Sequence, residues 1–183
     1  MLGSVSRDTR NGMNNNNPPT IEAAILLSQM ETIEIEKIGA VTGVKLSLDR
    51  ARSHKHFHVF RGCNDAAGAI AEVECRTARV NGASKGALIY LALNEKFAPT
   101  GAEVVSRLGK PRSVQAPSAQ AGAGGSTIYV YPISGGELRF AVKAGAPDAV
   151  FSIAIDRTAL VPHPRVASRL AKWGNVDLTP FTA

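Results

Sequence analysis

The feature that most constrains the fold of this chain is an apolar segment that occurs twice. Residues 87–94 read Ala-Leu-Ile-Tyr-Leu-Ala-Leu-Asn, and residues 149–156, which begin 62 positions later, read Ala-Val-Phe-Ser-Ile-Ala-Ile-Asp. Both are short runs of β-branched, aromatic and aliphatic residues, which is the composition of a buried strand. We therefore expect two similar halves, each of which ends in the same strand.

Helical patterns precede this strand in both halves. Residues 32–43 carry isoleucine and valine at intervals of three, and the segment ends in a glycine, which is typical of a helix C-terminus. Residues 100–108 lie between a proline and a glycine, the arrangement expected of a complete short helix. A further helix is expected over 21–30, capped by Thr20.

Strand-like segments separated by Gly, Asn and Ser clusters fill the rest of both halves. The expected strands are 44–48, 54–61, 69–78, 87–93, 126–132, 137–143 and 149–156. Strands joined by short turns are antiparallel. The expected fold is therefore α+β, with two helix-plus-three-strand repeats forming one antiparallel sheet and the helices on one face.

The domain organisation follows from where the apolar pattern begins and ends. Residues 1–19 contain four consecutive asparagines and few apolar residues, so burial cannot offset the entropy of ordering and a disordered tail is expected. Residues 20–160 form the single expected domain, with repeats at 20–94 and 99–157. Residues 161–183 are expected to be a C-terminal extension.

The composition argues against a membrane protein and leaves room for an acidic partner. No apolar run in the 183 residues approaches the ~18 to 20 that a membrane-spanning helix requires. Polar residues, not the apolar stretch of a secretory signal, follow Arg10, so the expected location is the cytoplasm. The net charge of +6 is spread along the chain and favours partners such as nucleic acid.

The two cysteines, Cys63 and Cys75, are expected to be free thiols. If the strands around them form a hairpin, Cys63 lies beside the turn and Cys75 lies further along the partner strand. At ~3.3 Å per residue the two would be roughly 20 Å apart, far beyond the ~7 Å limit for bridging Cα atoms.

The histidines of the segment His54-x-His56-x-His58 are the strongest candidates in the chain for binding a metal ion. Residues two apart on a strand point to one face, so imidazoles placed in this way can share a metal ion. A third ligand is needed, and the available side chains are Glu72, Glu74, Cys63 and Cys75. The competing interpretation is a polar, solvent-facing row opposite buried Phe57 and Val59.

Other catalytic signatures are missing from the sequence pattern. There is no Gly-x-Ser-x-Gly segment to present a nucleophile. The glycine-rich segment 122–125 precedes a predicted strand and not the helix N-terminus that binds phosphate. We therefore expect a protein that is not an enzyme and holds no cofactor.

Basic and aromatic residues are interleaved at 55–61, where Lys55, Phe57, Phe60 and Arg61 can contact phosphates and stack on bases. A basic nucleic-acid-binding protein is therefore the first alternative function. A metal-dependent enzyme that uses the three histidines is the second alternative.

A set of short motifs in the second half resembles a known module. It comprises Leu-Gly-Lys-Pro at 108–111, Tyr-Val-Tyr at 129–131 and Leu-Arg-Phe at 138–140. The pattern resembles the small outer-membrane assembly lipoproteins and, in tandem, the β-lactamase inhibitor protein family. The resemblance covers about residues 100–156, and 32–93 by analogy through the repeat. It implies a binding scaffold that holds partners on an exposed sheet face or its loops, without catalysis.

The function expected from these observations is that of a non-enzymatic protein-binding module. A cytoplasmic inhibitor or immunity-type protein from a bacterium fits best, with a toxin or an enzyme as its protein partner. Partner-binding candidates are residues out of phase with the expected core, and they include the Tyr and Arg types common at binding hot spots. The candidates are His56, His58, Phe60, Arg76, Tyr129, Tyr131 and Arg139.

Overall fold

The two repeated segments lie next to each other in the middle of a single sheet. In the computed structural model, β4 (Ala87–Leu93) pairs antiparallel with β8 (Val150–Asp156), and Leu91 lies opposite Ile153. The structure describes residues 20–64, 68–78, 86–117, 125–143 and 148–157. The tail predicted over 1–19 and the extension predicted over 161–183 lie outside the described residues.

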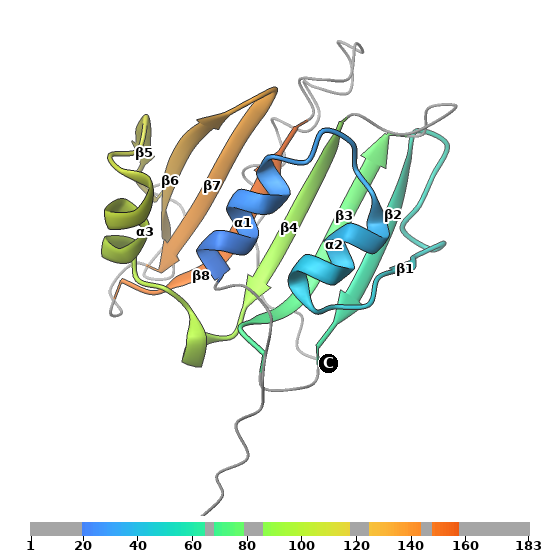
Figure 1. Ribbon diagram of the computed structural model, residues 1–183, viewed down its shortest axis with the longest axis horizontal. Helices are drawn as coiled ribbons and strands as arrows, with labels where there is room; N and C mark the ends of the chain where they lie inside the picture. Colours follow the sequence, from blue (N-terminus) through green and yellow to red (C-terminus); the bar gives the residue numbers. More distant parts are fainter. Residues whose placement is uncertain (1–19, 65–67, 79–85, 118–124, 144–147, 158–183) are drawn as a thin grey trace, which may run out of the picture.

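Within the described residues, eight strands form one sheet in the order β1-β2-β3-β4-β8-β7-β6-β5 (Figure 1). The strands on either side of the central pair are β1 (Ser47–Leu48), β2 (Phe57–Cys63), β3 (Ile70–Ala78), β5 (Ser113–Gln115), β6 (Ser126–Ile133) and β7 (Gly136–Lys143). All neighbouring strands are antiparallel. Short connections favour this for strands that are consecutive in the chain, and the non-consecutive pair β4–β8 has the same orientation. The α+β class and the antiparallel sheet are confirmed.

The edge strand β5 is not among the strands that the sequence pattern predicts. Its three residues, Ser113, Val114 and Gln115, are all exposed, and a run of three residues is too short for alternation to identify a strand. The strand β1 occupies the corresponding place at the opposite edge of the sheet. With β5 included, each half therefore contributes four strands after its helix.

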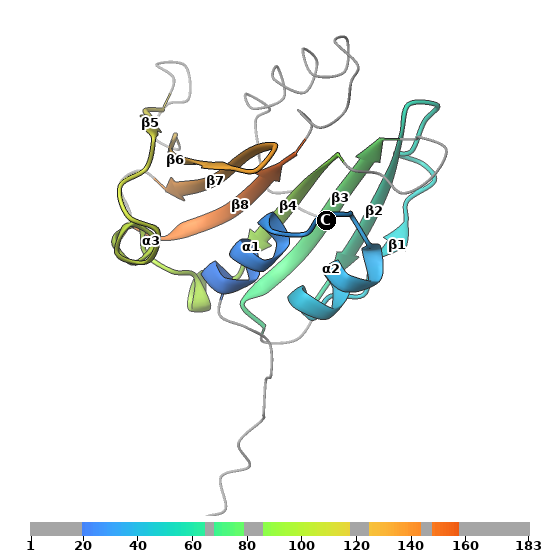
Figure 2. The same cartoon turned by 45° about the horizontal axis from the view of Figure 1, so that its top comes forward.

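The helices α1 (Thr20–Ser28), α2 (Ile35–Thr42) and α3 (Gly101–Leu108) lie on the same side of the sheet (Figures 1 and 2). A short 3₁₀ helix, η1 (Glu95–Phe97), precedes α3. The second helix is shorter than predicted. It ends as predicted at Gly43, whose φ of 71° is readily adopted by glycine and whose N–H donates to the carbonyl of Gly39.

The helix α3 is held by a reciprocal cap and by contact with β6. The Thr100 side chain accepts a hydrogen bond from the backbone of Glu103, and the Glu103 carboxylate accepts one from the backbone of Thr100. These hydrogen bonds lower the pKa of Glu103. At the other side of the first turn, a Cβ added to Gly101 would lie 3.1 Å from the ring of Tyr129. The absence of a side chain therefore lets the helix approach the sheet.

The hydrophobic core lies between the helices and one face of the sheet. We call this face the helix side and the opposite face the open face. The largest fully buried side chains include Leu27 and Ile38 from the helices and Ile89, Leu91, Phe140, Ile153 and Ile155 from the strands. The core spans both halves of the sheet, so neither half buries its apolar side chains alone.

Both cysteines are free, as predicted, with Cys63 exposed and Cys75 buried. On adjacent strands, Cys63 lies opposite Glu72 and Cys75 lies opposite Phe60. Among the described residues, no helix is long and apolar enough to cross a membrane.

Candidate functional site

The middle of the open face is formed by small and apolar side chains of the two central strands. In β4, Ile89 and Leu91 are buried on the helix side, so the residues between and beside them face the other way. Strand pairing places the corresponding residues of β8 beside them. We call these residues the central strip: Leu88, Tyr90, Ala92, Ser152 and Ala154.

Tyr90 is the largest side chain of the central strip. It lies opposite Glu74 of β3 and Ala154 of β8. Burial raises the pKa of Tyr90, and a hydrogen bond with Ser152 opposes that shift. The hydroxyl is therefore neutral near pH 7, and it can offer a hydrogen bond as well as apolar ring surface.

Charged side chains border the central strip on the β2–β3 side. We call them the first charged cluster: Asp49, Arg52, Arg61, Glu72, Glu74 and Arg76. Arg61 Nε lies 3.1 Å from Glu72 Oε1 and 3.4 Å from Glu74 Oε2. Burial lowers the pKa of Arg61, but the hydrogen bond to Glu72 and the charges of Glu72, Glu74 and Cys63 together outweigh it, and the pKa is raised overall.

Glu74 is the centre of this first charged cluster. It is only 8% exposed, and it contacts three guanidinium groups, those of Arg52, Arg61 and Arg76. A buried carboxylate is tolerated when several charged donors satisfy it. The network therefore orients long side chains along one border of the central strip.

The second charged cluster, formed by Arg112, Glu137 and Arg139, borders the other side of the strip. Arg139 Nη2 lies 2.9 Å from Glu137 Oε2, and Arg112 also pairs with Glu137. The hydrogen bond from Arg139 lowers the pKa of Glu137, although burial opposes this shift. The open face therefore has an apolar strip in its middle and charged clusters on both sides of it.

Two of the seven predicted partner-binding residues, Arg76 and Arg139, lie on the open face. Arg76 lies opposite Leu88, and Arg139 lies opposite Ala154. Tyr90 was not predicted as a site residue. Segment 87–93 is apolar or aromatic throughout, so its sequence carries no alternation that assigns Tyr90 to a face, and only the burial of the folded strand alternates.

The prediction that Tyr129 and Tyr131 are exposed is wrong, because both lie on the helix side. Tyr129 pairs with Phe140 and Tyr131 with Leu138, and both partners belong to the core. Tyr131 is 7% exposed, and its hydroxyl donates to the carbonyl of Gly109 at 3.1 Å. The tyrosines hold α3 against β6 and do not form an open surface.

The prediction that His58 and Phe60 lie on the exposed face is also wrong. They pair with Thr77 and Cys75, which are buried on the helix side, and Phe60 packs against the core. Val59 is buried as predicted, but it lies on the open face opposite Arg76. Because β2 buries side chains on both of its faces, Val59 on the open face and Phe60 on the helix side, the sequence pattern assigned its two sides wrongly.

The three histidines do not form one row on a strand. His54 and His56 are exposed in the turn before β2, where the His56 backbone N–H donates to His54 Nδ1 at 3.2 Å. His58 lies within the strand, and its Nδ1 is buried without a hydrogen-bond partner. Within the part of the chain that the structure describes, no group of three or more His, Cys, Asp or Glu side chains is placed to hold a metal ion.

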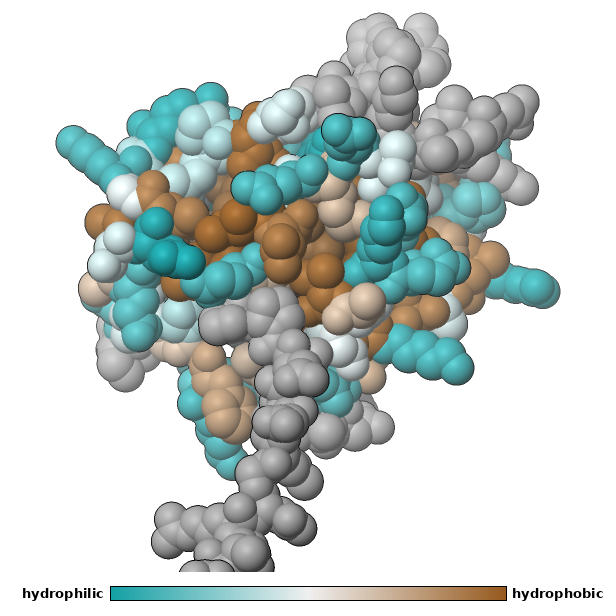
Figure 3. All heavy atoms as spheres, in the orientation of Figure 1, coloured by the Kyte–Doolittle hydropathy of each residue, from teal (hydrophilic) through white to brown (hydrophobic). Residues whose placement is uncertain are grey.

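The helix side carries apolar surface of its own. Figure 3 views this side, and apolar side chains gather near its middle among charged ones. Leu26 of α1 is 48% exposed and Val105 of α3 is 37% exposed. The two helices are linked by an ion pair in which Arg107 Nε lies 2.9 Å from Glu22 Oε1.

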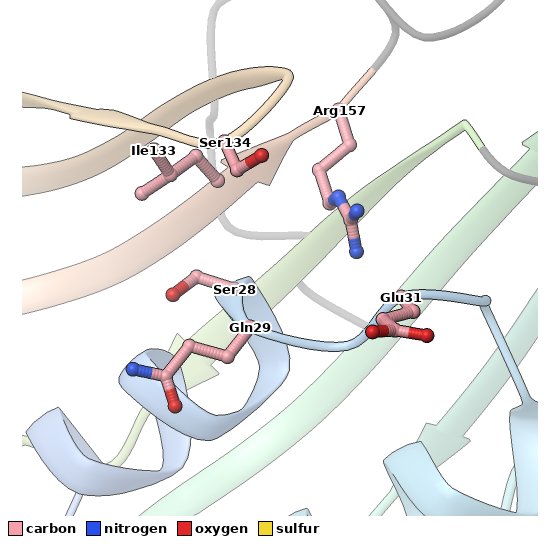
Figure 4. A pocket seen from close by; sticks show the side chains of 6 residues that line it. All are labelled: Ser28, Gln29, Glu31, Ile133, Ser134 and Arg157. Atoms are coloured by element: carbon pink, nitrogen blue, oxygen red, sulfur yellow. The ribbon is translucent and has the colours of Figure 1, made fainter.

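A hollow with both polar and apolar lining lies at the end of the sheet, between α1 and the turn that joins β6 to β7. It measures about 400 Å³, and its lining residues are Ser28, Gln29, Glu31, Ile133, Ser134 and Arg157 (Figure 4). Arg157 was not predicted as a site residue, because a lone arginine after a strand carries no recognisable signal. The residues that line the hollow, Arg157 included, come from three distant parts of the chain.

Comparison of the chain with protein-family models, with curated proteins and with solved structures finds no match in any of the three.

Proposed function

We propose that this protein is a non-enzymatic protein-binding module, an inhibitor or immunity-type protein of bacterial origin, whose partner docks on the open face. The observation that carries the proposal is the central strip between two charged clusters. Tyr90 supplies a half-buried aromatic anchor, and Arg76 and Arg139 supply arginines on either side of it. Tyr and Arg are the residue types that most often dominate binding energy.

The charge arrangement favours a protein partner over nucleic acid. Arg61, Arg76, Arg112 and Arg139 of the open face all pair with carboxylates. A phosphate backbone is bound by cations that are available to replace its counterions. Arginines already paired with carboxylates are better suited to orienting a mixed, polar protein surface.

The proposal includes the predicted origin of the sheet in two repeats. Its support is that α2 and α3 are each followed by four strands, and that the strand order runs outward from the β4–β8 pair in both directions. The resemblance to tandem modules of the β-lactamase inhibitor protein family is part of the same proposal. In that arrangement the sheet face opposite the helices is left for a partner.

The test is affinity capture from the native cell lysate with the wild-type chain and with Tyr90→Ala and Arg139→Ala single variants. The matched control is Leu26→Ala, which shortens an exposed apolar side chain on the helix side. We expect one protein to be captured by wild type and by the control. Binding to either open-face variant should be about 30-fold weaker, which corresponds to a hot-spot loss of about 2 kcal/mol.

Folding of each variant must first be matched to wild type by circular dichroism and urea unfolding. Loss of the captured protein in Leu26→Ala alone would move the interface to the helix side and contradict the proposal. Retention of nucleic acid in place of protein, with a steep dependence on salt, would instead support the nucleic-acid alternative.

A further inference from the structure

The most unusual polar group of the described residues is the guanidinium of Arg157. The residue follows β8 directly, and its backbone N–H donates to the carbonyl of Ala87 at 2.8 Å, which fixes the base of the side chain. Arg157 is only 5% exposed, yet Nε and Nη1 are buried without a hydrogen-bond partner. Among the described residues, the partly exposed arginines of the two charged clusters, such as Arg61 and Arg139, do pair with carboxylates.

A buried cation without acceptors is unfavourable, because it has lost its water and gained nothing in return. An acceptor that comes from outside the chain, such as a water, an ion or a ligand, is one explanation for such a group in a natural protein. The position of Arg157 points to such a ligand, since its side chain projects into the hollow between α1 and the β6–β7 turn (Figure 4).

The lining of the hollow combines polar groups with apolar surface. Ser28 and Gln29 at the end of α1 and Ser134 in the turn supply hydroxyl and amide groups, while Ile133 is the apolar member. Glu31 lies across the hollow from Arg157 (Figure 4), and no ion pair joins the two residues. A volume of about 400 Å³ is at the small end of the range for ligand sites.

We propose that this hollow binds a carboxylate, with Arg157 as the residue that recognises it. A guanidinium pairs with a carboxylate through two parallel N–H···O bonds, either from Nε and Nη2 or from Nη1 and Nη2, so a bound carboxylate would supply an acceptor to one of the two unpaired donors. A phosphate dianion fits less well, because the hollow lies at the carbonyl end of α1 and faces Glu31, and both disfavour a second negative charge. The site is separate from the open face and goes beyond the proposed protein-binding function.

The carboxylate has two possible sources, a free small molecule or an acidic side chain of a polypeptide. The test uses the full chain labelled with ¹⁵N and follows the arginine Nε–H signals by NMR. Separate titrations add sodium acetate, a short blocked peptide with a central glutamate, and sodium phosphate, with sodium chloride as the ionic-strength control. The Arg157 signal is assigned with an Arg157→Lys variant.

We expect a saturable shift of the Arg157 signal with acetate, with the glutamate peptide or with both, and at least tenfold weaker binding of phosphate. Saturation by acetate alone assigns the site to small molecules, and clearly tighter binding of the peptide assigns it to a polypeptide. A Ser134→Ala variant, which leaves the guanidinium in place, should weaken the binding severalfold. A Glu31→Gln variant should strengthen it, because one repelling charge is removed.

Two results would overturn the proposal. The first is that the Arg157 signal shifts no more with carboxylates than with chloride, at up to 100 mM of added salt. The second is a change of the Arg157 signal in Glu31→Gln before any ligand is added, combined with loss of all response to carboxylates. That combination would mean that Glu31 itself satisfies Arg157 in solution.

Discussion

Cys75 is expected to resist thiol reagents about a thousandfold more than an exposed cysteine does. The side chain is fully buried on the helix side of β3, and burial, followed by the charge of Glu74, raises its pKa from 9.0 to about 12. A shift of about three pKa units lowers the reactive thiolate fraction at pH 8 by about 1,000-fold. Access to the buried sulfur requires local opening and slows the reaction further.

The assay is an Ellman titration at pH 8 in the native state and in denaturant, with Cys63→Ser and Cys75→Ser variants that each retain one thiol. We expect one rapidly reacting thiol in the native wild type and two in denaturant. Native Cys63→Ser should react slowly, and native Cys75→Ser should react at once. Equal rates for the two variants would refute the β3 register and, with it, the assignment of the open face.

The same shift predicts a loss of stability in alkali. Because the pKa of Cys75 is raised on folding, the thiol's contribution to stability is fully present below pH 9 and is lost as the pH rises towards 12. By pH 10.5 the loss attributable to this group is about 2 kcal/mol. Urea midpoints at pH 8 and 10.5 should therefore fall further for wild type than for Cys75→Val, and parallel falls would contradict the prediction.

Three further substitutions test the packing that positions the site. Phe140→Ala removes a fully buried ring and should lower the free energy of unfolding, measured in urea titrations, by about 3–5 kcal/mol. The control Lys143→Ala, on the same strand, should change it by less than about 0.5 kcal/mol. Similar effects of the two substitutions would refute the core assignment. Thr100→Ala breaks the capping box of α3 and should cost about 1 kcal/mol, while Ser106→Ala on the exposed face of that helix should cost nothing. Gly136→Ala would place a Cβ 1.8 Å from a carbonyl oxygen of β8, so a thermal midpoint equal to wild type would show that β7 and β8 are not paired as described.

The sides that the sequence predicted for β2 and β6 are wrong, for a physical reason. In β4 burial alternates in the folded strand, but its residues are apolar or aromatic throughout, so the sequence predicted no sides for it. In β2 and β6, Val59 and Val130 are each 1% exposed although both lie on the open face. An apolar residue buried on the second face shifts the apparent phase of the strand and reverses the assignment of sides.

The segment from His54 to His58 shows a second reason why a sequence pattern can fail to predict which side chains share a face. A spacing of two implies a shared face only within a strand, and β2 begins at Phe57, after His54 and His56. The turn that holds these two histidines closes on itself through the hydrogen bonds between His54 and Phe57. Whether a residue belongs to a turn or to the adjoining strand depends on pairing with neighbours, which residue types alone do not reveal.

The amino-acid sequence by itself determined the α+β class, the antiparallel sheet, the helix ends at glycine and the free state of the two cysteines, because periodicity and capping act within a few residues. The tertiary structure alone decided which face of each outer strand is open. It also brought Ser28, Ser134 and Arg157 around one hollow. These are contacts between distant segments, and their geometry is set by strand register and helix packing, which local patterns do not encode.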